Sequence, residues 1–211
     1  MKIIDLSHKF DSMTPVYPGT EPPSISHEAT IDNNGFSEKL LTFSTHTGTH
    51  IDVPAHIIKG GAAIDTMEIS RFTGRGYAVD VSKCSYDLIT IKDLIIYEED
   101  IKKADFLILH SGWYRYCWSD SYFTGFPVLS HESAEWLTGF NLKGIGVDTI
   151  SADPVESTDY SNHMTLLSNN IIIIENLKDT DELTGKEFTF YAFPLNIENG
   201  DGSPVRAVAI I

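Results

Sequence analysis

The chain has 211 residues, 42% hydrophobic and 21% charged, which is the composition of an ordinary globular protein. Thirty aspartates and glutamates against fifteen lysines and arginines give a net charge of −15, which disfavours nucleic acid and membrane surfaces as partners. The two cysteines, Cys84 and Cys117, form no CxxC pair, which excludes a disulfide scaffold and a cysteine-rich zinc site.

The predicted elements follow one another along the whole chain. The proline-rich stretch TPVYPGTEPPS predicts irregular structure near the N-terminus. In the segment 38–50, Leu41, Phe43 and Thr45 alternate with polar neighbours, which predicts a strand. A helix is predicted at 129–140, with Ser130 as its N-cap. Further strands are predicted at 76–82, 104–112, 143–151, 169–177 and 202–211.

The order of these elements predicts the fold class. No repeat or linker interrupts the chain, so we expect one domain over residues 1–211. Strands outnumber helices, which predicts an α/β protein with a mixed, barrel-like β core flanked by short helices. The N-terminus carries Asp5 and His8 where a signal peptide needs apolar residues. The longest aliphatic run, Ile171–Ile174, is far too short to span a membrane. We therefore expect a cytoplasmic protein.

A cluster of ionisable residues lies in the stretch THTGTHIDVPAH. In an extended chain the side chains of His46, His50, Asp52 and His56 share one face. A straight strand would nevertheless separate His46 from His50 by about 13 Å, at about 3.3 Å per residue. Two imidazoles that far apart do not share an ion, because Zn–N bonds are only about 2 Å long. We therefore expect the strand to bend at Gly48, where glycine permits it.

The composition of this cluster indicates metal or catalytic chemistry. Two histidines and a carboxylate provide nitrogen and oxygen ligands suited to Zn²⁺ or Mn²⁺. Such an ion lowers the pKa of water and polarises a carbonyl, which favours hydrolysis. Iron oxygenases also use two histidines and one carboxylate, so this motif alone leaves redox chemistry open.

The stretch HTGTHIDVPAH resembles the HxGTHxDxPxH motif of the cyclase-like metal-dependent hydrolases, a family that includes bacterial kynurenine formamidases and isatin hydrolases. Further segments are similar to the family along nearly the whole chain: IIDLSHKFDSMTPVYPG, GVDTISADP, HMTLLSNNIIIIENL and GDGSPVRAVAI. The resemblance implies a fold of the swivelling β/β/α type. It also implies a small-molecule substrate and a homo-oligomer, a dimer or larger, in which a neighbouring chain helps to close the pocket.

The resemblance also implies roles for individual residues. His46 and His50 would hold one divalent ion and His163 a second. Asp52 and Glu175 would bridge both ions, so that one or two Zn²⁺ or Mn²⁺ ions bind per chain. The acid/base would be His56.

Substrate binding is expected at Tyr17. Bacterial kynurenine formamidases tend to have tryptophan at this position, where the side chain packs on the ring of the substrate. Tyrosine offers a smaller face and a hydroxyl. This departure leaves the choice among formamides, lactams and small esters open.

Two alternatives remain from the residues alone. The aromatic stretch WYRYCW at 113–118 is interpreted as packing, or else as a wall of an apolar substrate pocket. The chain is expected to be either a hydrolase of C–N amide bonds or a metal-binding or ligand-binding protein on the same scaffold. His56 discriminates between them, because a pure binder needs no free imidazole beside the metals.

Overall fold

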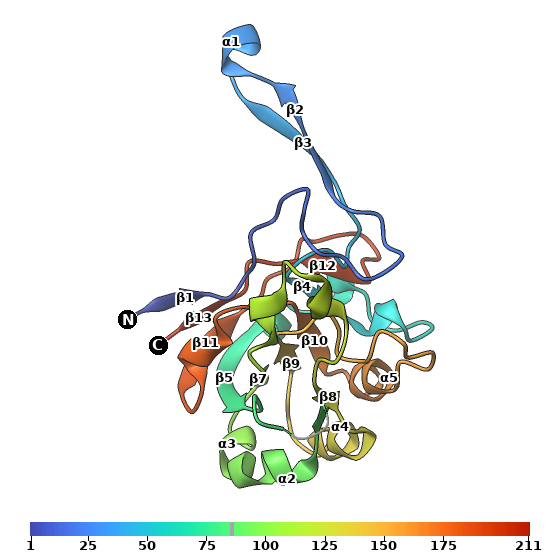
Figure 1. The fold of residues 1–211 in the computed structure, drawn as a ribbon, viewed down its shortest axis with the longest axis vertical. Helices are drawn as coiled ribbons and strands as arrows, with labels where there is room; N and C mark the ends of the chain where they lie inside the picture. The colour runs from blue at the N-terminus through green and yellow to red at the C-terminus, as the bar shows by residue number, and fades with distance from the viewer. Residues whose placement is uncertain (85–86) are drawn as a thin grey trace.

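The structure is a computed structural model that describes residues 1–84 and 87–211 (Figure 1). Strands make up most of its regular structure. They are β1 Ile3–Asp5, β2 Ser24–Ala29, β3 Glu38–Thr42, β4 His50–Asp52, β5 Thr73–Asp80, β6 Leu88–Ile89, β7 Phe106–His110, β8 Val128–Leu129, β9 Gly144–Val147, β10 Ile172–Glu175, β11 Glu187–Tyr191, β12 Gly202–Pro204 and β13 Val208–Ile210.

The helices are short. The α-helices are α1 Ile31–Asn34, α2 Ile91–Leu94, α3 Glu98–Ile101, α4 His131–Leu137 and α5 Ser161–Ser168. Single 3₁₀ turns lie at Pro54–His56, Ile64–Thr66, Ile69–Phe72, Ile95–Tyr97, Trp113–Tyr116, Asp120–Phe123 and Thr180–Leu183. The longest of the α-helices has 8 residues, so the sheet determines the architecture.

Nine strands form one mixed sheet in the order β1-β13-β11-β5-β7-β9-β10-β4-β12. Strands β5, β7, β9 and β10 are parallel to one another in the centre of the sheet. The pairs on either side are antiparallel, including β10 with β4 and β4 with β12. The predicted mixed β core with short helices is confirmed.

The chain path between β12 and β13 shows how strongly this sheet curls. In the sheet order, seven strand spacings separate the two, which would be about 34 Å in a flat sheet at about 4.8 Å per spacing. The chain from Pro204 to Val208 takes four residue steps, which reach at most about 14 Å. The two ends of the sheet must therefore approach each other, as in a half-barrel.

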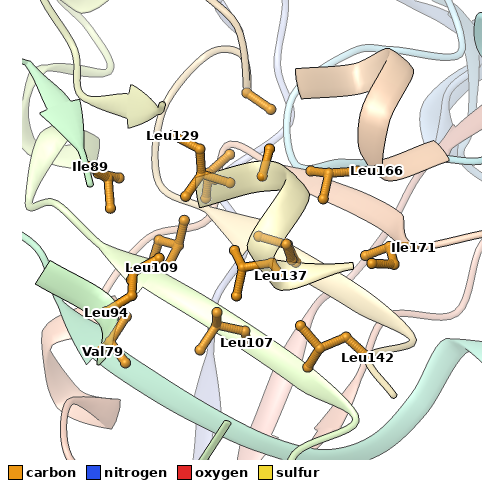
Figure 2. Close-up of a cluster of buried hydrophobic side chains, with 14 of the residues drawn as sticks. Val79, Ile89, Leu94, Leu107, Leu109, Leu129, Leu137, Leu142, Leu166 and Ile171 are labelled. Carbon is orange, nitrogen blue, oxygen red and sulfur yellow. The ribbon is translucent and has the colours of Figure 1, made fainter. Parts of the chain in front are cut away.

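The central strands β5, β7 and β10 bury side chains on both faces of the sheet. In β7, Leu107 and Leu109 join the cluster beneath α4 and α5, whereas Phe106 and Ile108 join the cluster inside the curl. Figure 2 shows the first cluster, in which Leu137 from α4 and Leu166 from α5 lie near the strand residues. Burial on both faces explains why these strands read as continuous apolar runs, as is usual for parallel strands.

A hairpin of β2 and β3 projects away from the sheet, with α1 at its tip (Figure 1). The two strands pair antiparallel from Ser24 with Thr42 to Ala29 with Glu38. All five residues of β3 are exposed. We call residues 24–42 the arm.

Two segments that were each predicted as one strand contain two separate strands, so these two predictions are wrong. The segment 38–50 is divided between β3 in the arm and β4 in the sheet, because the chain is irregular from 43 to 49. The segment 202–211 is divided into β12 and β13, because the chain crosses there between the two ends of the curled sheet. The strands predicted within 76–82, 104–112, 143–151 and 169–177 are confirmed as β5, β7, β9 and β10.

The predicted helix at 129–140 is confirmed as α4, and the Ser130 side chain accepts a hydrogen bond from the backbone N–H of Ser133. The proline-rich segment before β2 is irregular, as predicted. Trp113 and Cys117 pack with Tyr122 in a small apolar cluster, which supports the packing interpretation of WYRYCW. In the part of the chain that the structure describes, we find no helix with the length and apolar character needed to cross a membrane.

Candidate metal centre

A pocket of about 370 Å³ lies where β4, β10 and α5 meet the proline-rich segment. Its lining contains all seven residues singled out from the sequence: Tyr17, His46, His50, Asp52, His56, His163 and Glu175. Thr20, Ile57, Ile150, Ser151 and Tyr160 complete the lining. The structure thus brings together residues separated by more than 150 positions in the chain.

A turn at Gly48 places the first two histidines. Gly48 has a φ of +65°, a left-handed conformation that glycine adopts without the steric cost other residues incur. The rings of His46 and His50 consequently lie 5.2 Å apart between centroids, which confirms the predicted bend. The Nδ1–H of His50 donates to the carbonyl oxygen of Gly48 at 2.8 Å, and this assigns its tautomer and leaves Nε2 free to act as a ligand.

The pairing of β4 with β10 places two carboxylates beside His50. Glu175 is the register partner of His50. Nε2 of His50 lies 3.2 Å from Oδ1 of Asp52 and 3.5 Å from Oε2 of Glu175. Both carboxylates are buried. Burial by itself would raise the pKa of Asp52, but His50, His163 and His46 together hold it well below the usual value, so Asp52 is ionised.

Helix α5 contributes His163 from the other side. Asp153 accepts hydrogen bonds from Nδ1 of His163 at 2.7 Å and from the His163 backbone N–H at 3.0 Å. The second ring nitrogen, Nε2, lies 3.2 Å from Oε1 of Glu175 and 3.6 Å from Oδ2 of Asp52. Asp153 therefore fixes the ring so that its free nitrogen faces the two carboxylates.

His46 and His56 lie at the more open edge of the site. Nδ1 of His46 contacts Oδ1 of Asp52 at 2.6 Å, and its Nε2 contacts Oδ2 of Asp201 at 3.0 Å. Burial alone would lower the pKa of His46, but Asp52 and Asp201 raise it to about 9. The centroids of the His56 and His46 rings lie 3.9 Å apart. Nδ1 of His56 is 3.9 Å from Oδ2 of Asp201. Burial lowers the pKa of His56, so its imidazole is neutral near pH 7.

The donor set fits a divalent cation. Oδ2 of Asp52 is buried and has no hydrogen-bond partner among the described residues, and such an ionised oxygen needs a compensating charge. Within residues 1–84 and 87–211, two groups of donor atoms lie close enough to hold an ion: His50, Asp52 and Glu175, and His46, Asp52 and His56. Nitrogen and oxygen donors of this kind match Zn²⁺ and Mn²⁺.

Three residues beside the predicted ligands, Asp153, Asp201 and Tyr160, were not predicted from the sequence. Asp153 precedes Pro154, a position typical of a turn residue; it accepts a hydrogen bond from the backbone N–H of Asn162, but it also orients His163. Asp201 lies between two glycines and contacts His46 across 155 positions, so nothing local indicated its role. Tyr160 has a left-handed backbone, which its sequence neighbours do not predict.

Known proteins resemble this chain over nearly its whole length. A family described as putative cyclase matches residues 4–154. A kynurenine formamidase of Salinibacter ruber is 32% identical over 213 residues, covering 99% of this chain and 97% of that protein.

Two solved structures share the fold. Isatin hydrolase A from Ralstonia solanacearum has a TM-score of 0.89 and 26% identity, with 100% of this chain and 92% of that one covered. A structure described as a predicted metal-dependent hydrolase from Bacillus stearothermophilus has a TM-score of 0.81 and 27% identity, with coverages of 99% and 97%. The chain belongs to the putative cyclase family.

Proposed function

We propose that the protein is a metal-dependent hydrolase that cleaves a C–N amide bond of a small molecule, over a single catalytic domain of residues 1–211. The observation that carries the proposal is the buried, ionised Asp52, whose Oδ2 has no hydrogen-bond partner in the described part of the chain while three histidines surround it. Relatives named kynurenine formamidase and isatin hydrolase support this reaction class.

In this proposal, one or two Zn²⁺ or Mn²⁺ ions bind per chain. His46 and His50 would hold one ion and His163 the other, and Asp52 and Glu175 would be ligands shared by both ions. Carboxylate oxygens of Asp52 lie 2.6, 3.2 and 3.6 Å from ring nitrogens of His46, His50 and His163, which supports Asp52 as a shared ligand. A divalent ion held there supplies Lewis acidity, which polarises a carbonyl and lowers the pKa of water.

His56 carries the proton in this mechanism. Its side chain is 33% exposed at the pocket, so a bound substrate can reach it. Because burial keeps the imidazole neutral, it can accept a proton from water and pass it to the departing nitrogen. An amide nitrogen leaves poorly unless it is protonated, so this transfer is essential to the reaction.

The substrate is a formamide or a lactam, with Tyr17 in the binding surface. The Tyr17 hydroxyl donates to the carbonyl oxygen of Val155 at 2.9 Å. This bond holds the ring at the pocket and engages the hydroxyl proton, so Tyr17 would meet a substrate through its ring or as a hydrogen-bond acceptor.

The experiment is a hydrolysis screen on chelator-treated protein that is reconstituted with Zn²⁺ or Mn²⁺. The substrates are an N-formyl arylamine and a bicyclic lactam. We expect metal-dependent release of formate or of the ring-opened acid, which His50→Ala abolishes. His131→Ala is the matched control, because His131 lies on the exposed face of α4 away from the pocket. Equal rates with and without metal, or hydrolysis of neither substrate, would contradict the proposal.

A second candidate is a metal-binding or ligand-binding protein on this scaffold without hydrolytic activity. The grouping of His56 with His46 and Asp52 as three donors close enough to share an ion favours it. If all three bind metal, no free imidazole remains for proton transfer. The His56 measurement described in the Discussion separates the two candidates.

We also propose a cytoplasmic homo-oligomer, a dimer or larger, in which the arm packs on a second copy of the chain. An isolated two-stranded hairpin is at best marginally stable in water, yet this arm exposes Ile31, Phe36 and Leu40 by 70%, 55% and 54%. A symmetric partner would bury both arms reciprocally. Light scattering should report a dimer or larger, and replacing residues 26–40 by a short turn should give a monomer. A monomeric full-length chain would contradict this.

A further inference from the structure

Tyr160 combines a place in the pocket lining with an unfavourable backbone. It has φ 49° and ψ 46° at the N-cap of α5. This left-handed conformation suits glycine and asparagine and costs other residues free energy. Its carbonyl oxygen accepts the first helical hydrogen bond, from Met164 at 2.8 Å. Glycine or asparagine would make that bond equally well, so the helix does not require a tyrosine.

Folding gains little from the Tyr160 ring. The residue is 40% exposed, and the ring meets the His163 ring edge-on at a centroid distance of 6.5 Å. A bulky side chain with a strained backbone and a partly exposed position in a pocket lining is typical of a functional contact.

The chemistry of the pocket indicates what that contact recognises. The ionisable residues gather around Asp52, whereas Tyr17, Tyr160, Ile57 and Ile150 provide apolar surface in the same pocket. Tyr17 and Tyr160 are linked through one loop, because the Tyr17 hydroxyl is bonded to Val155, five residues before Tyr160. Burial raises the pKa of Tyr17 and Tyr160 adds to the rise, which agrees with both phenols lining one pocket.

We propose that Tyr160 is a specificity-determining residue, whose ring forms with Tyr17 the aromatic surface that binds a planar aryl group next to the reacting amide. The assignment rests on the proposed function, in which the amide is placed at the histidine and carboxylate cluster. Aromatic rings prefer edge-to-face or offset contacts with another ring. Tyr160 therefore selects aryl over alkyl amides of otherwise equal chemistry.

The test uses two metal-chelating ligands that are not hydrolysed as amides and differ in their ring: benzohydroxamate and acetohydroxamate. Their dissociation constants are measured by calorimetry on the zinc-loaded protein. In the unmodified chain benzohydroxamate should bind more tightly. Tyr160→Ala should lower that preference about two- to tenfold, the worth of one aromatic pair, with acetohydroxamate affinity unchanged. Tyr160→Phe should restore the preference, because the ring is retained.

Two controls keep the result interpretable. Tyr116→Ala removes a comparably exposed ring, at 48%, that lies outside the pocket lining, and should leave the preference intact. Tyr160→Gly removes the ring and also the steric strain of the left-handed backbone. The thermal midpoint of this variant should equal or exceed that of the unmodified chain, while its preference for benzohydroxamate falls.

The outcomes are distinguishable. An unchanged preference in Tyr160→Ala, or a clearly lower midpoint in Tyr160→Gly, would overturn the assignment of Tyr160. If neither hydroxamate binds the unmodified protein, the proposed metal site itself is wrong, and the Tyr160 assignment falls with it.

Discussion

Nδ1 of His50 lies 2.8 Å from the carbonyl oxygen of Gly48, two residues earlier in the chain. Because Gly48 is left-handed, its carbonyl turns back toward the imidazole that follows it. The ring is thereby held with Nε2 facing Asp52 and Glu175. A left-handed backbone conformation, which glycine adopts at the lowest steric cost, is thus part of the candidate metal centre.

Gly48→Ala should weaken metal binding although no ligand is changed. A Cβ at this position would lie 3.1 Å from Cγ2 of Thr14, and the left-handed backbone adds roughly 1–2 kcal/mol of strain. We expect zinc affinity to fall about 10- to 100-fold, the usual effect of losing a contact that orients a ligand, as measured by competition with a chromogenic chelator. Gly185→Ala is the matched control, because Gly185 has a φ of +68° and no atom within 4 Å of its Cβ position. Equal zinc affinities in the two variants would refute the role of the turn.

Asp153→Ala should loosen His163 without removing it. The Asp153 carboxylate accepts from Nδ1 of His163 and from two backbone N–H groups at the start of α5. We expect a loss of metal affinity of about 10- to 100-fold, measured by calorimetry. Asp148→Ala is the control for general destabilisation, since Asp148 is equally buried and accepts from the backbone N–H groups of Ser111 and Gly112. If both variants bind zinc with equal affinity, Asp153 does not position the ligand.

Chelation should lower the thermal midpoint. An ion that binds only the folded chain stabilises it by about 2.7 kcal/mol at a hundred times its dissociation constant. For a chain of this size, that corresponds to roughly 5–10 °C. Scanning calorimetry with Zn²⁺ and with EDTA measures the difference. His50→Ala should abolish it, whereas His131→Ala should keep it; a midpoint that does not respond to the metal in any of these proteins would refute the metal centre.

The sequence predicts the parts of the fold and site that local patterns determine. The strands β7 and β10 read as apolar runs because both of their faces are buried. Four of the site residues fall within eleven positions, from His46 to His56, so their proximity needs one bend rather than a whole fold. Because glycine has the most conformational freedom, the sequence also predicts that the bend lies at Gly48.

Long-range arrangement explains what the sequence did not predict. Leu41 and Phe43 alternate with polar neighbours like strand residues, but the arm carries Leu41 away from the sheet, where its side chain is exposed. The split between β12 and β13 depends on the curl of nine strands. Asp201 meets His46 only because β12 pairs beside β4, a pairing that no short stretch encodes.

The most direct test of the hydrolase proposal is metal content and turnover measured on the same sample of His56→Ala. If His56 moves the proton, this variant should keep the metal stoichiometry of the unmodified chain and lose roughly 10²–10⁴-fold in kcat, the usual worth of general acid–base catalysis. His46→Ala, measured alongside, should lose metal and turnover together. A His56→Ala protein that loses metal in step with its activity would show that His56 is a ligand, and would contradict the mechanism proposed for this site.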